Sequence, residues 1–376
     1  MAITVISIMG SGCISDSMDE VEKYMEMIPS GHGTEYVPDI NGMTVPLAFS
    51  QNPIAYEQMP EPTSFMHPGF DMASRLQRMG MYQGSTGVVD LSIRNEGSRD
   101  MFIYSYGIRV EENDQFISME NGITIPPGEE RKIGMIGLEI PENTDTITIR
   151  PTISMLAQTK SGSWFDCKEE VFDEIELETS PLPEKEYPEQ YSNKPYLFEK
   201  ANDKVNSRDI GVRQIAVGAA KEYPGAYNIF QICSLFDYTK ENIQYISDPR
   251  GGDYWADPNE TLQVGAGDCD DYATLMAALI EAIGGTSRIY LTDDHAFAAA
   301  YIGNDTQHIE EIAEAIRQYH GPVPVYYTTD EYGSWLMLDP TSSMYPGDLP
   351  GGTAPTKDGW TYLNTTTIRT IDIIPG

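Results

Sequence analysis

Positive charge is scarce in this 376-residue chain. Its 24 Lys and Arg residues stand against 58 Asp and Glu residues, which gives a formal net charge of −34 at pH 7. Nucleic-acid recognition needs a basic patch, so this balance argues strongly against a nucleic-acid partner, and equally against electrostatic docking on an anionic membrane. Hydrophobic residues still make up 40% of the chain, which is enough for folded cores and excludes a wholly disordered acidic protein.

Cysteine and long apolar runs are also scarce. The chain has 4 cysteines, which make neither a disulfide framework nor a paired CxxC zinc site. No segment approaches the roughly eighteen unbroken apolar residues of a membrane-spanning helix. The sequence therefore predicts no transmembrane segment, and contact with a membrane is expected only through a lipid anchor.

The amino terminus carries a candidate anchor. Residues 2–9 form a short apolar run, and small residues then lead to Cys13. This order resembles the end of a lipoprotein signal peptide, whose cysteine becomes the lipidated first residue of the mature chain. A preceding basic residue is missing, which a start codon set too far downstream would explain, and Gly10 replaces the usual Leu-like residue. We expect a truncated signal over residues 1–13 and an extracytoplasmic, lipid-anchored protein; the alternative is a buried amino-terminal strand.

Composition and periodicity divide the rest of the chain. Residues 14–71, rich in Pro, Met and acids, are expected to form a tether. Residues 72–179 hold about seven short strand-like segments separated by turn signals, which predict an immunoglobulin-like β-sandwich. Residues 180–201 are rich in proline and predict an extended linker. In residues 202–376, helical periodicity comes first and strand-like runs follow, which is an α+β pattern.

The most informative stretch is residues 265–285, GAGDCDDYATLMAALIEAIGG. Apolar residues after Cys269 recur at helical spacing, and the closing pair of glycines ends the helix. Cys269 is therefore expected at a helix amino terminus, where N–H groups and the dipole lower a thiol pKa and can hold an oxyanion. Three aspartates oppose this effect, because nearby carboxylates raise a thiol pKa; they are residues 268, 270 and 271.

Two residues further along the chain can complete a nucleophilic site. His295 opens a strand-like run, so its imidazole can reach an adjacent helix start, take the thiol proton and give it to a leaving group. Asp339 ends another strand-like run before a proline, which places a carboxylate at a sheet edge, where it can fix the imidazole tautomer. Cys, His and Asp in this chain order follow the logic of a catalytic triad.

This joint pattern resembles the transglutaminase-like superfamily of cysteine enzymes, which have a papain-like fold. The motifs that carry the resemblance are GAGDCDDYATL at 265–275, DHAF at 294–297 and WLMLDPT at 335–341. The resemblance covers about residues 206–343. It implies that Cys269 is the nucleophile, His295 the acid and base, and Asp339 the orienting acid.

The resemblance also bears on the surroundings of the site. Family members often use an upstream aromatic side chain as oxyanion donor, and Tyr245 and Trp255 are the candidates here, although each would equally suit a core. The family often has Trp two residues after the histidine, where this chain has Phe297. Residues 304–329 look like an inserted helix that could cover the cleft.

We therefore expect a surface-tethered cysteine enzyme that acts on amide bonds of a protein or peptide through a thioester at Cys269. Hydrolysis and acyl transfer share every catalytic residue, and we favour hydrolysis because no amine site is evident. The alternative is a non-catalytic surface protein whose two domains bind partners. No cofactor is expected. Calcium is a minor alternative without a matching ligand loop, and its candidate ligands are Asp268, Asp270, Asp271, Asp293 and Asp294.

Overall fold

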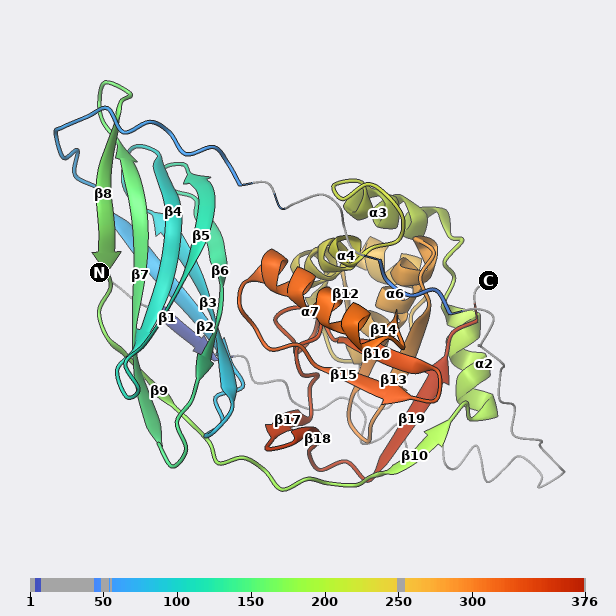
Figure 1. Cartoon of the computed structure of the whole chain (residues 1–376). Coiled ribbons are helices and arrows are strands. Elements are labelled where there is room, and N and C mark those ends of the chain that lie inside the picture. Colours follow the sequence, from blue (N-terminus) through green and yellow to red (C-terminus); the bar gives the residue numbers. More distant parts are fainter. Residues whose placement is uncertain (1–3, 8–43, 49–53, 55, 249–253, 375–376) are drawn as a thin grey trace, which may run out of the picture.

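The computed structural model describes residues 4–7, 44–48, 54, 56–248 and 254–374, which form two folded units lying side by side (Figure 1). The first unit is all-β, and the second combines helices with a mixed sheet. This α+β architecture with a β-rich amino-terminal unit confirms the predicted fold class. The described part of the chain contains no helix that is long and apolar enough to cross a membrane.

The amino-terminal unit is a sandwich of two sheets. One sheet has the order β1 (Thr4–Ser7), β2 (Met72–Met79), β3 (Thr86–Asn95), β6 (Glu130–Glu139). The other has the order β5 (Gln115–Ile125), β4 (Met101–Val110), β7 (Thr146–Gln158), β8 (Trp164–Val171), and β9 (Ile175–Glu178) also pairs with β7. Buried and less buried residues alternate along β2, as in a strand with one face toward a core. The inner faces share one apolar cluster, which confirms the immunoglobulin-like sandwich.

The amino-terminal residues form a short strand. Strand β1 pairs in parallel with β2, from Thr4 opposite Arg75 to Ser7 opposite Arg78. This agrees with the alternative expectation for the amino terminus, a strand within the fold. Cys13 lies outside the described residues, so its lipidation stays a prediction.

The predicted tether, residues 14–71, is described only in part, and two of its described segments contact the folded units. Leu47 is fully buried in the core of the second unit, and its carbonyl oxygen accepts a hydrogen bond from His308 Nε2 at 2.6 Å. The carboxylate of Glu57 accepts a hydrogen bond from the backbone N–H of Thr124 on β5 at 3.0 Å. These residues therefore contact both units instead of forming a free spacer.

The carboxy-terminal unit is built on a six-stranded sheet. Its order is β10 (Glu189–Ser192), β19 (Thr367–Asp372), β13 (Ser287–Leu291), β14 (Ala296–Gly303), β16 (Gly333–Leu338), β15 (Tyr327–Asp330). Two small sheets accompany it: β11 (Gln244–Tyr245) with β12 (Ala266–Gly267), and β17 (Thr353–Thr356) with β18 (Gly359–Tyr362). The helices are α2 (Pro195–Lys204), α3 (Ile210–Ala220), α4 (Ile229–Asn242), α5 (Pro258–Val264), α6 (Cys269–Ala282) and α7 (Thr306–His320).

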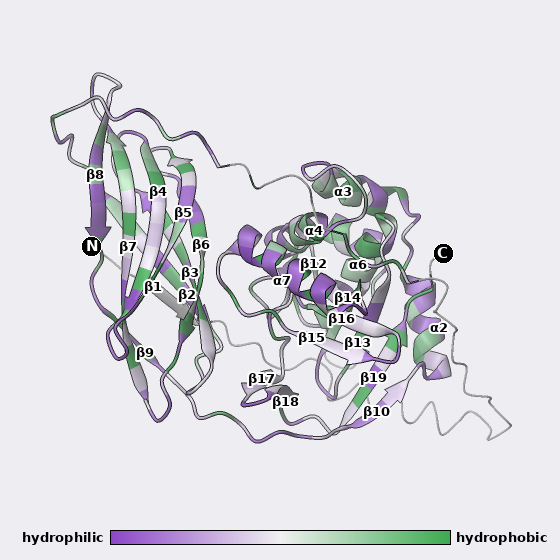
Figure 2. Cartoon of the chain, viewed as in Figure 1, coloured by the Kyte–Doolittle hydropathy of each residue, from purple (hydrophilic) through white to green (hydrophobic). Residues whose placement is uncertain are grey.

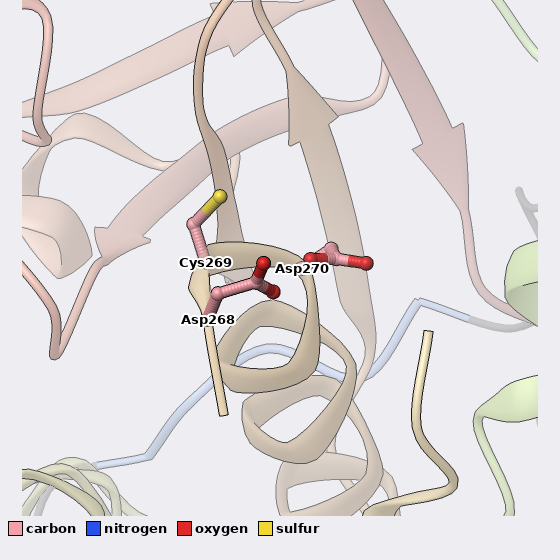
Figure 3. Close-up of side chains that lie close together, drawn as sticks. All are labelled: Asp268, Cys269 and Asp270. Atoms are coloured by element: carbon pink, nitrogen blue, oxygen red, sulfur yellow. The ribbon is translucent and has the colours of Figure 1, made fainter. Parts of the chain in front are cut away.

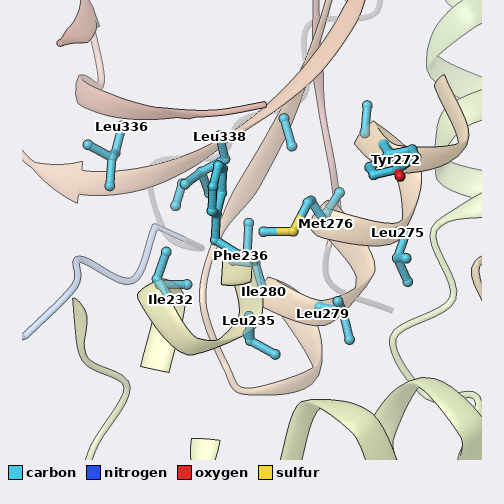
Figure 4. Packing of buried hydrophobic residues seen from close by; sticks show 14 of the residues in the cluster. Ile232, Leu235, Phe236, Tyr272, Leu275, Met276, Leu279, Ile280, Leu336 and Leu338 are labelled. Atoms are coloured by element: carbon cyan, nitrogen blue, oxygen red, sulfur yellow. The ribbon is translucent and has the colours of Figure 1, made fainter. Parts of the chain in front are cut away.

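Helix α6 is the central helix of this unit. Every residue from Cys269 to Ile280 is buried, as in a helix that neighbours cover on all sides. Figure 4 shows Phe236 of α4, Met276 of α6 and Leu338 of β16 packed in one cluster. In Figure 2, α6 is mostly apolar, whereas α7 carries polar segments along its length. Because α6 is held on every side, the residue at its start has a fixed position.

The predicted linker, residues 180–201, is wrong from residue 189 onward. Strand β10 pairs in parallel with β19 near the end of the chain, and α2 begins at Pro195. Proline is favoured in the first turn of a helix, so a proline-rich composition does not separate a linker from a helix start. The expected inserted helix is present as α7, which packs against α4 and β14.

The two units meet at the end of α7. The backbone N–H of Gly137 on β6 donates to the carbonyl oxygen of Pro322 at 2.8 Å. Gly321 has φ +112°, and a side chain there would overlap the carbonyl oxygen of Met135. Val88 and Met135 of the sandwich belong to the apolar core of the second unit. The sandwich therefore packs directly against the second unit and contributes residues to its core.

Candidate active site

The candidate nucleophile, Cys269, is the first residue of α6 and is fully buried. Gly265, at φ +68°, ends α5 and lets the chain turn through β12 into the helix. The backbone N–H of Asp268 donates to Asp271 Oδ2 at 3.3 Å, and Asp271 Oδ1 accepts from the N–H of Ala256 at 2.7 Å. These contacts fix the helix start, where the first N–H groups and the positive end of the dipole lie.

Acidic side chains flank the sulfur, as the sequence predicts. The Sγ of Cys269 and carboxylate oxygens of Asp268 and Asp270 all lie within 4.8 Å of one another. Figure 3 shows the sulfur projecting beyond the first turn of the helix, whereas both carboxylates lie beside that turn. Negative charge this close raises a thiol pKa, so a thiolate here needs the helix end and a cationic partner.

These three residues are the one group of possible metal ligands found in the described part of the chain. A thiol with two carboxylates lacks the roughly six to eight oxygen ligands that calcium prefers. Among the other aspartates of the calcium alternative, Asp271 binds the N–H of Ala256, and Asp293 accepts the N–H of Thr366 at 2.6 Å. The five aspartates therefore do not assemble into a single cation site.

The candidate base and the candidate orienting acid are in direct contact. His295 Nε2 and Asp339 Oδ2 lie 2.6 Å apart. The sheet explains this contact: β14 and β16 are antiparallel neighbours with Ala298 opposite Leu338, so the residue before β14 lies beside the residue after β16. Asp339 is 1% exposed, which keeps solvent away from the pair.

The ionisation of Asp339 follows from its surroundings. Burial alone would raise the pKa of this carboxyl, but the charge of His295 and the hydrogen bonds from His295, Thr341 and Gly351 hold the pKa at about 2. Asp339 is therefore ionised near neutral pH and can only accept hydrogen bonds. It follows that Nε2 of His295 carries a proton, which leaves Nδ1 as the nitrogen able to accept another.

The three candidate residues come from adjoining elements. Helix α6 packs against β14, and Cys269 shares one buried cluster with Ala296, the neighbour of His295. Burial and the nearby charge of Asp339 raise the pKa of Tyr272, which lies in the first turn of α6, so the end of β16 lies near the start of that helix. The catalytic roles of the three candidate residues stay predictions.

The two oxyanion candidates occupy different environments. Tyr245 lies on β11 opposite Gly267, its ring centroid is 6.5 Å from that of Tyr272 on α6, and it is 40% exposed. Trp255 is buried, and the Nζ of Lys200 lies 4.3 Å from the centroid of its ring. Tyr245 is therefore partly exposed beside the first turn of α6, whereas Trp255 has the surroundings of a core residue.

The loop after β16 contains supporting residues that the sequence did not reveal. Gly351 donates its N–H to Asp339 Oδ2 at 2.8 Å, and Thr341 donates its N–H to Oδ1 at 3.1 Å. Asp348 accepts the N–H groups of Met344 and Leu349, both at 2.8 Å, and burial raises its pKa to about 6. In the sequence, this loop shows only a composition that is typical of turns. Such a composition does not reveal which groups the backbone N–H groups contact.

A curated protein resembles part of this chain. Over 82 residues the chain is 33% identical to UPF0252 protein PH0672 of Pyrococcus horikoshii. The matched part is 22% of this chain and 26% of that protein, so the chain spans about a quarter of the length of this relative.

Solved structures share weaker similarity. A candidate cysteine protease from Cytophaga hutchinsonii is 14% identical, with 74% of this chain and 79% of that chain covered, at a TM-score of 0.25. The CARDB domain of the PF1109 protein from Pyrococcus furiosus, solved with di-metal ions, is 11% identical, with 33% of this chain and 100% of that chain covered, at a TM-score of 0.21. Both TM-scores are low, and neither structure adds to the assignment.

A family model gives the assignment. The model of the transglutaminase-like superfamily matches residues 213–340. This range contains Cys269, His295 and Asp339 with the elements that carry them. Residues 213–340 therefore form a transglutaminase-like domain, the family that the three sequence motifs predict.

Proposed function

We propose that this chain is a cysteine enzyme that acts on amide bonds of proteins or peptides, with Cys269 as the nucleophile. One observation carries the proposal: a buried contact between His295 and an ionised Asp339, whose charge also acts on Tyr272 in the first turn of α6. The membership of this region in the transglutaminase-like superfamily supports it. Neither the substrate nor the reaction beyond this class follows from the family alone.

The proposed chemistry uses the proton positions derived above. Nδ1 of His295 takes the proton of the Cys269 thiol, and the thiolate attacks the carbonyl carbon of the amide. N–H groups at the start of α6 stabilise the resulting oxyanion. The imidazolium gives its proton to the leaving amine, and a thioester remains on Cys269. Water then attacks the thioester, with His295 as base, and releases a carboxylic acid and the thiol; an amine in place of water gives a new amide.

The first test is the alkylation rate of each cysteine by iodoacetamide at pH 6 to 7, read by peptide mass spectrometry. We expect Cys269 to react at least about tenfold faster than a free thiol such as N-acetylcysteine, and to exceed Cys167 by still more, because burial raises the pKa of Cys167 to about 11. Cys233 is fully buried, burial raises its thiol pKa, and it should not react in folded protein. His295→Ala should slow Cys269 sharply and leave Cys167 unchanged.

A second candidate function rests on the complete burial of Cys269, which suits a non-catalytic binding protein. If Cys269 reacts no faster than N-acetylcysteine with iodoacetamide, and also with the smaller reagent methyl methanethiosulfonate, the thiol is not activated. The proposal of an enzyme is then wrong, and binding by the two units becomes the better hypothesis. The smaller reagent separates a thiol that is merely covered from one that is unreactive.

We also propose that the protein is extracytoplasmic and lipid-anchored through Cys13, on the sequence pattern alone. Removal of the residues before Cys13 would take β1 away and leave β2 as a sheet edge. In cells fed radioactive palmitate, we expect the full-length protein to be labelled and Cys13→Ser to lose the label. Equal labelling of both, or none of either, would contradict the anchor.

A further inference from the structure

A partly buried lysine holds the loop that carries the orienting acid. Lys240 lies near the end of α4, and its Nζ donates to the carbonyl oxygen of Ser343 at 2.7 Å and approaches that of Pro340 at 3.4 Å. Pro340 directly follows Asp339. The two carbonyl groups lie on either side of the first turn after β16, so a single ammonium group fixes both ends of that turn.

The same turn sets the direction of the Asp339 carboxylate. The N–H of Ser343 donates to the backbone carbonyl of Asp339 at 2.8 Å, while Thr341 and Gly351 donate to its carboxylate oxygens. If the turn opens, these donors move together, and the carboxylate loses the orientation that places Oδ2 against His295. Through these hydrogen bonds, Lys240 connects the turn to helix α4.

Charged groups of the loop and of the sandwich lie near Lys240. Asp339 and Asp348 face it from the loop, and Asp90 and Lys132 face it from strands β3 and β6 of the sandwich. Asp90 and Lys132 pair with each other at 3.4 Å. Burial lowers the pKa of Lys240, and the nearby carboxylates oppose that effect. The sandwich therefore contributes charged residues to the surroundings of Lys240.

We propose that Lys240 is a positioning residue of the triad: it holds the loop after β16 so that Asp339 orients His295, and the sandwich completes its surroundings. The inference rests on the proposed function for its catalytic meaning. The positioning itself is a property of the His295–Asp339 contact and can be measured without turnover. In this arrangement both units contribute residues that support the catalytic site.

The test compares Lys240→Met, Lys240→Gln and Lys240→Arg with the wild type in the full-length protein. The matched control is Lys221→Met, which removes an exposed lysine from the same unit. The first readout is the downfield proton resonance of His295 Nε2–H, identified by its loss in Asp339→Asn. The second is the alkylation rate of Cys269 by iodoacetamide, and circular dichroism monitors folding.

We expect Lys240→Met to shift or broaden the resonance and to slow alkylation of Cys269 about tenfold, because a displaced base no longer meets the thiol. Lys240→Arg should retain both signals, and Lys221→Met should change neither. If Lys240→Met does not fold, Lys240→Gln, whose NH2 group can still donate but carries no charge, takes its place. A folded Lys240→Met, or Lys240→Gln in its place, with the wild-type resonance and rate would overturn the inference.

The outcomes separate this inference from the proposed function. If Cys269 is slow in the wild type but the resonance moves in Lys240→Met, Lys240 positions the pair and the enzyme proposal fails. If Cys269 is fast in the wild type and equally fast in Lys240→Met, with an unchanged resonance, the enzyme proposal stands and the role of Lys240 is wrong.

Discussion

Replacing Asp339 with asparagine is expected to lower kcat by about three orders of magnitude while KM changes little. Oδ2 accepts hydrogen bonds from His295 and Gly351, and Oδ1 accepts from Thr341. An asparagine has one oxygen, so its NH2 group must face either the first pair of donors or the N–H of Thr341. Neither arrangement preserves the present contacts.

The loss follows from the tautomer of the imidazole. If the NH2 group faces His295, the ring turns its lone pair to Nε2, and Nδ1 then carries a proton and cannot take one from the thiol. In either arrangement the negative charge that stabilises the imidazolium is gone. Asp339 is almost completely buried, so it does not reach a substrate, and KM should stay within about twofold.

The measurement is steady-state kinetics on whichever amide substrate the wild-type protein cleaves. The matched control is Asp293→Asn, because Asp293 also holds a loop through hydrogen bonds from a threonine N–H and hydroxyl, those of Thr366. This control should keep kcat within a few-fold of wild type. A loss smaller than about tenfold in Asp339→Asn would mean that Asp339 only supports the fold.

The parts of the fold that the sequence predicts correctly are those with local signals. The strands of residues 72–179 follow from short strand-like segments and the turn signals between them, and the helix at Cys269 follows from spacing and from the glycines at both ends. The sequence places His295 at the start of one strand-like segment and Asp339 at the end of another, and these two residues can lie side by side when the two strands are antiparallel neighbours. The family motifs then imply that the two residues belong to one site.

The parts that the sequence does not predict depend on distant partners. Strand β10 has four residues and pairs with β19 at the far end of the chain, so its own residues carry no strand pattern. Leu47 is buried by the second unit although its neighbours have the composition of a tether. The hydrogen bond from Gly351 to Asp339 and that from Lys240 to Ser343 depend on how one loop closes over the sheet edge. The periodic pattern of apolar residues in a sequence does not reveal contacts of this kind.

Replacing Glu281 with glutamine is expected to stabilise the protein at pH 8 by about 2 to 3 kcal/mol relative to its effect at pH 5. Glu281 lies near the end of α6, and one carboxylate oxygen accepts the N–H and the hydroxyl of Ser287, both at 2.9 Å. These bonds lower its pKa, but the larger effect of burial raises it from 4.5 to about 7. The folded state therefore disfavours the charged carboxylate.

The direction of the pH effect follows from this raised pKa. Below about pH 4.5 the carboxyl is protonated in both the folded and the unfolded chain, and no cost arises. As the pH rises toward 7, the unfolded chain loses the proton first, so the free energy of unfolding falls, and above 7 the cost is constant. Glutamine keeps an oxygen for Ser287 and cannot ionise, which removes this pH-dependent cost.

Urea unfolding of both proteins at pH 5, 6, 7 and 8 measures the effect, with Glu222→Gln as the control at an exposed position. Any cost of the new NH2 group is the same at every pH, so the change in the difference between variant and wild type isolates the ionisation of Glu281. A difference that stays constant from pH 5 to 8 would show that Glu281 is charged in the folded protein at little cost. In that case water would have to reach the end of α6, and the helix that presents Cys269 would be less firmly enclosed than its buried residues indicate.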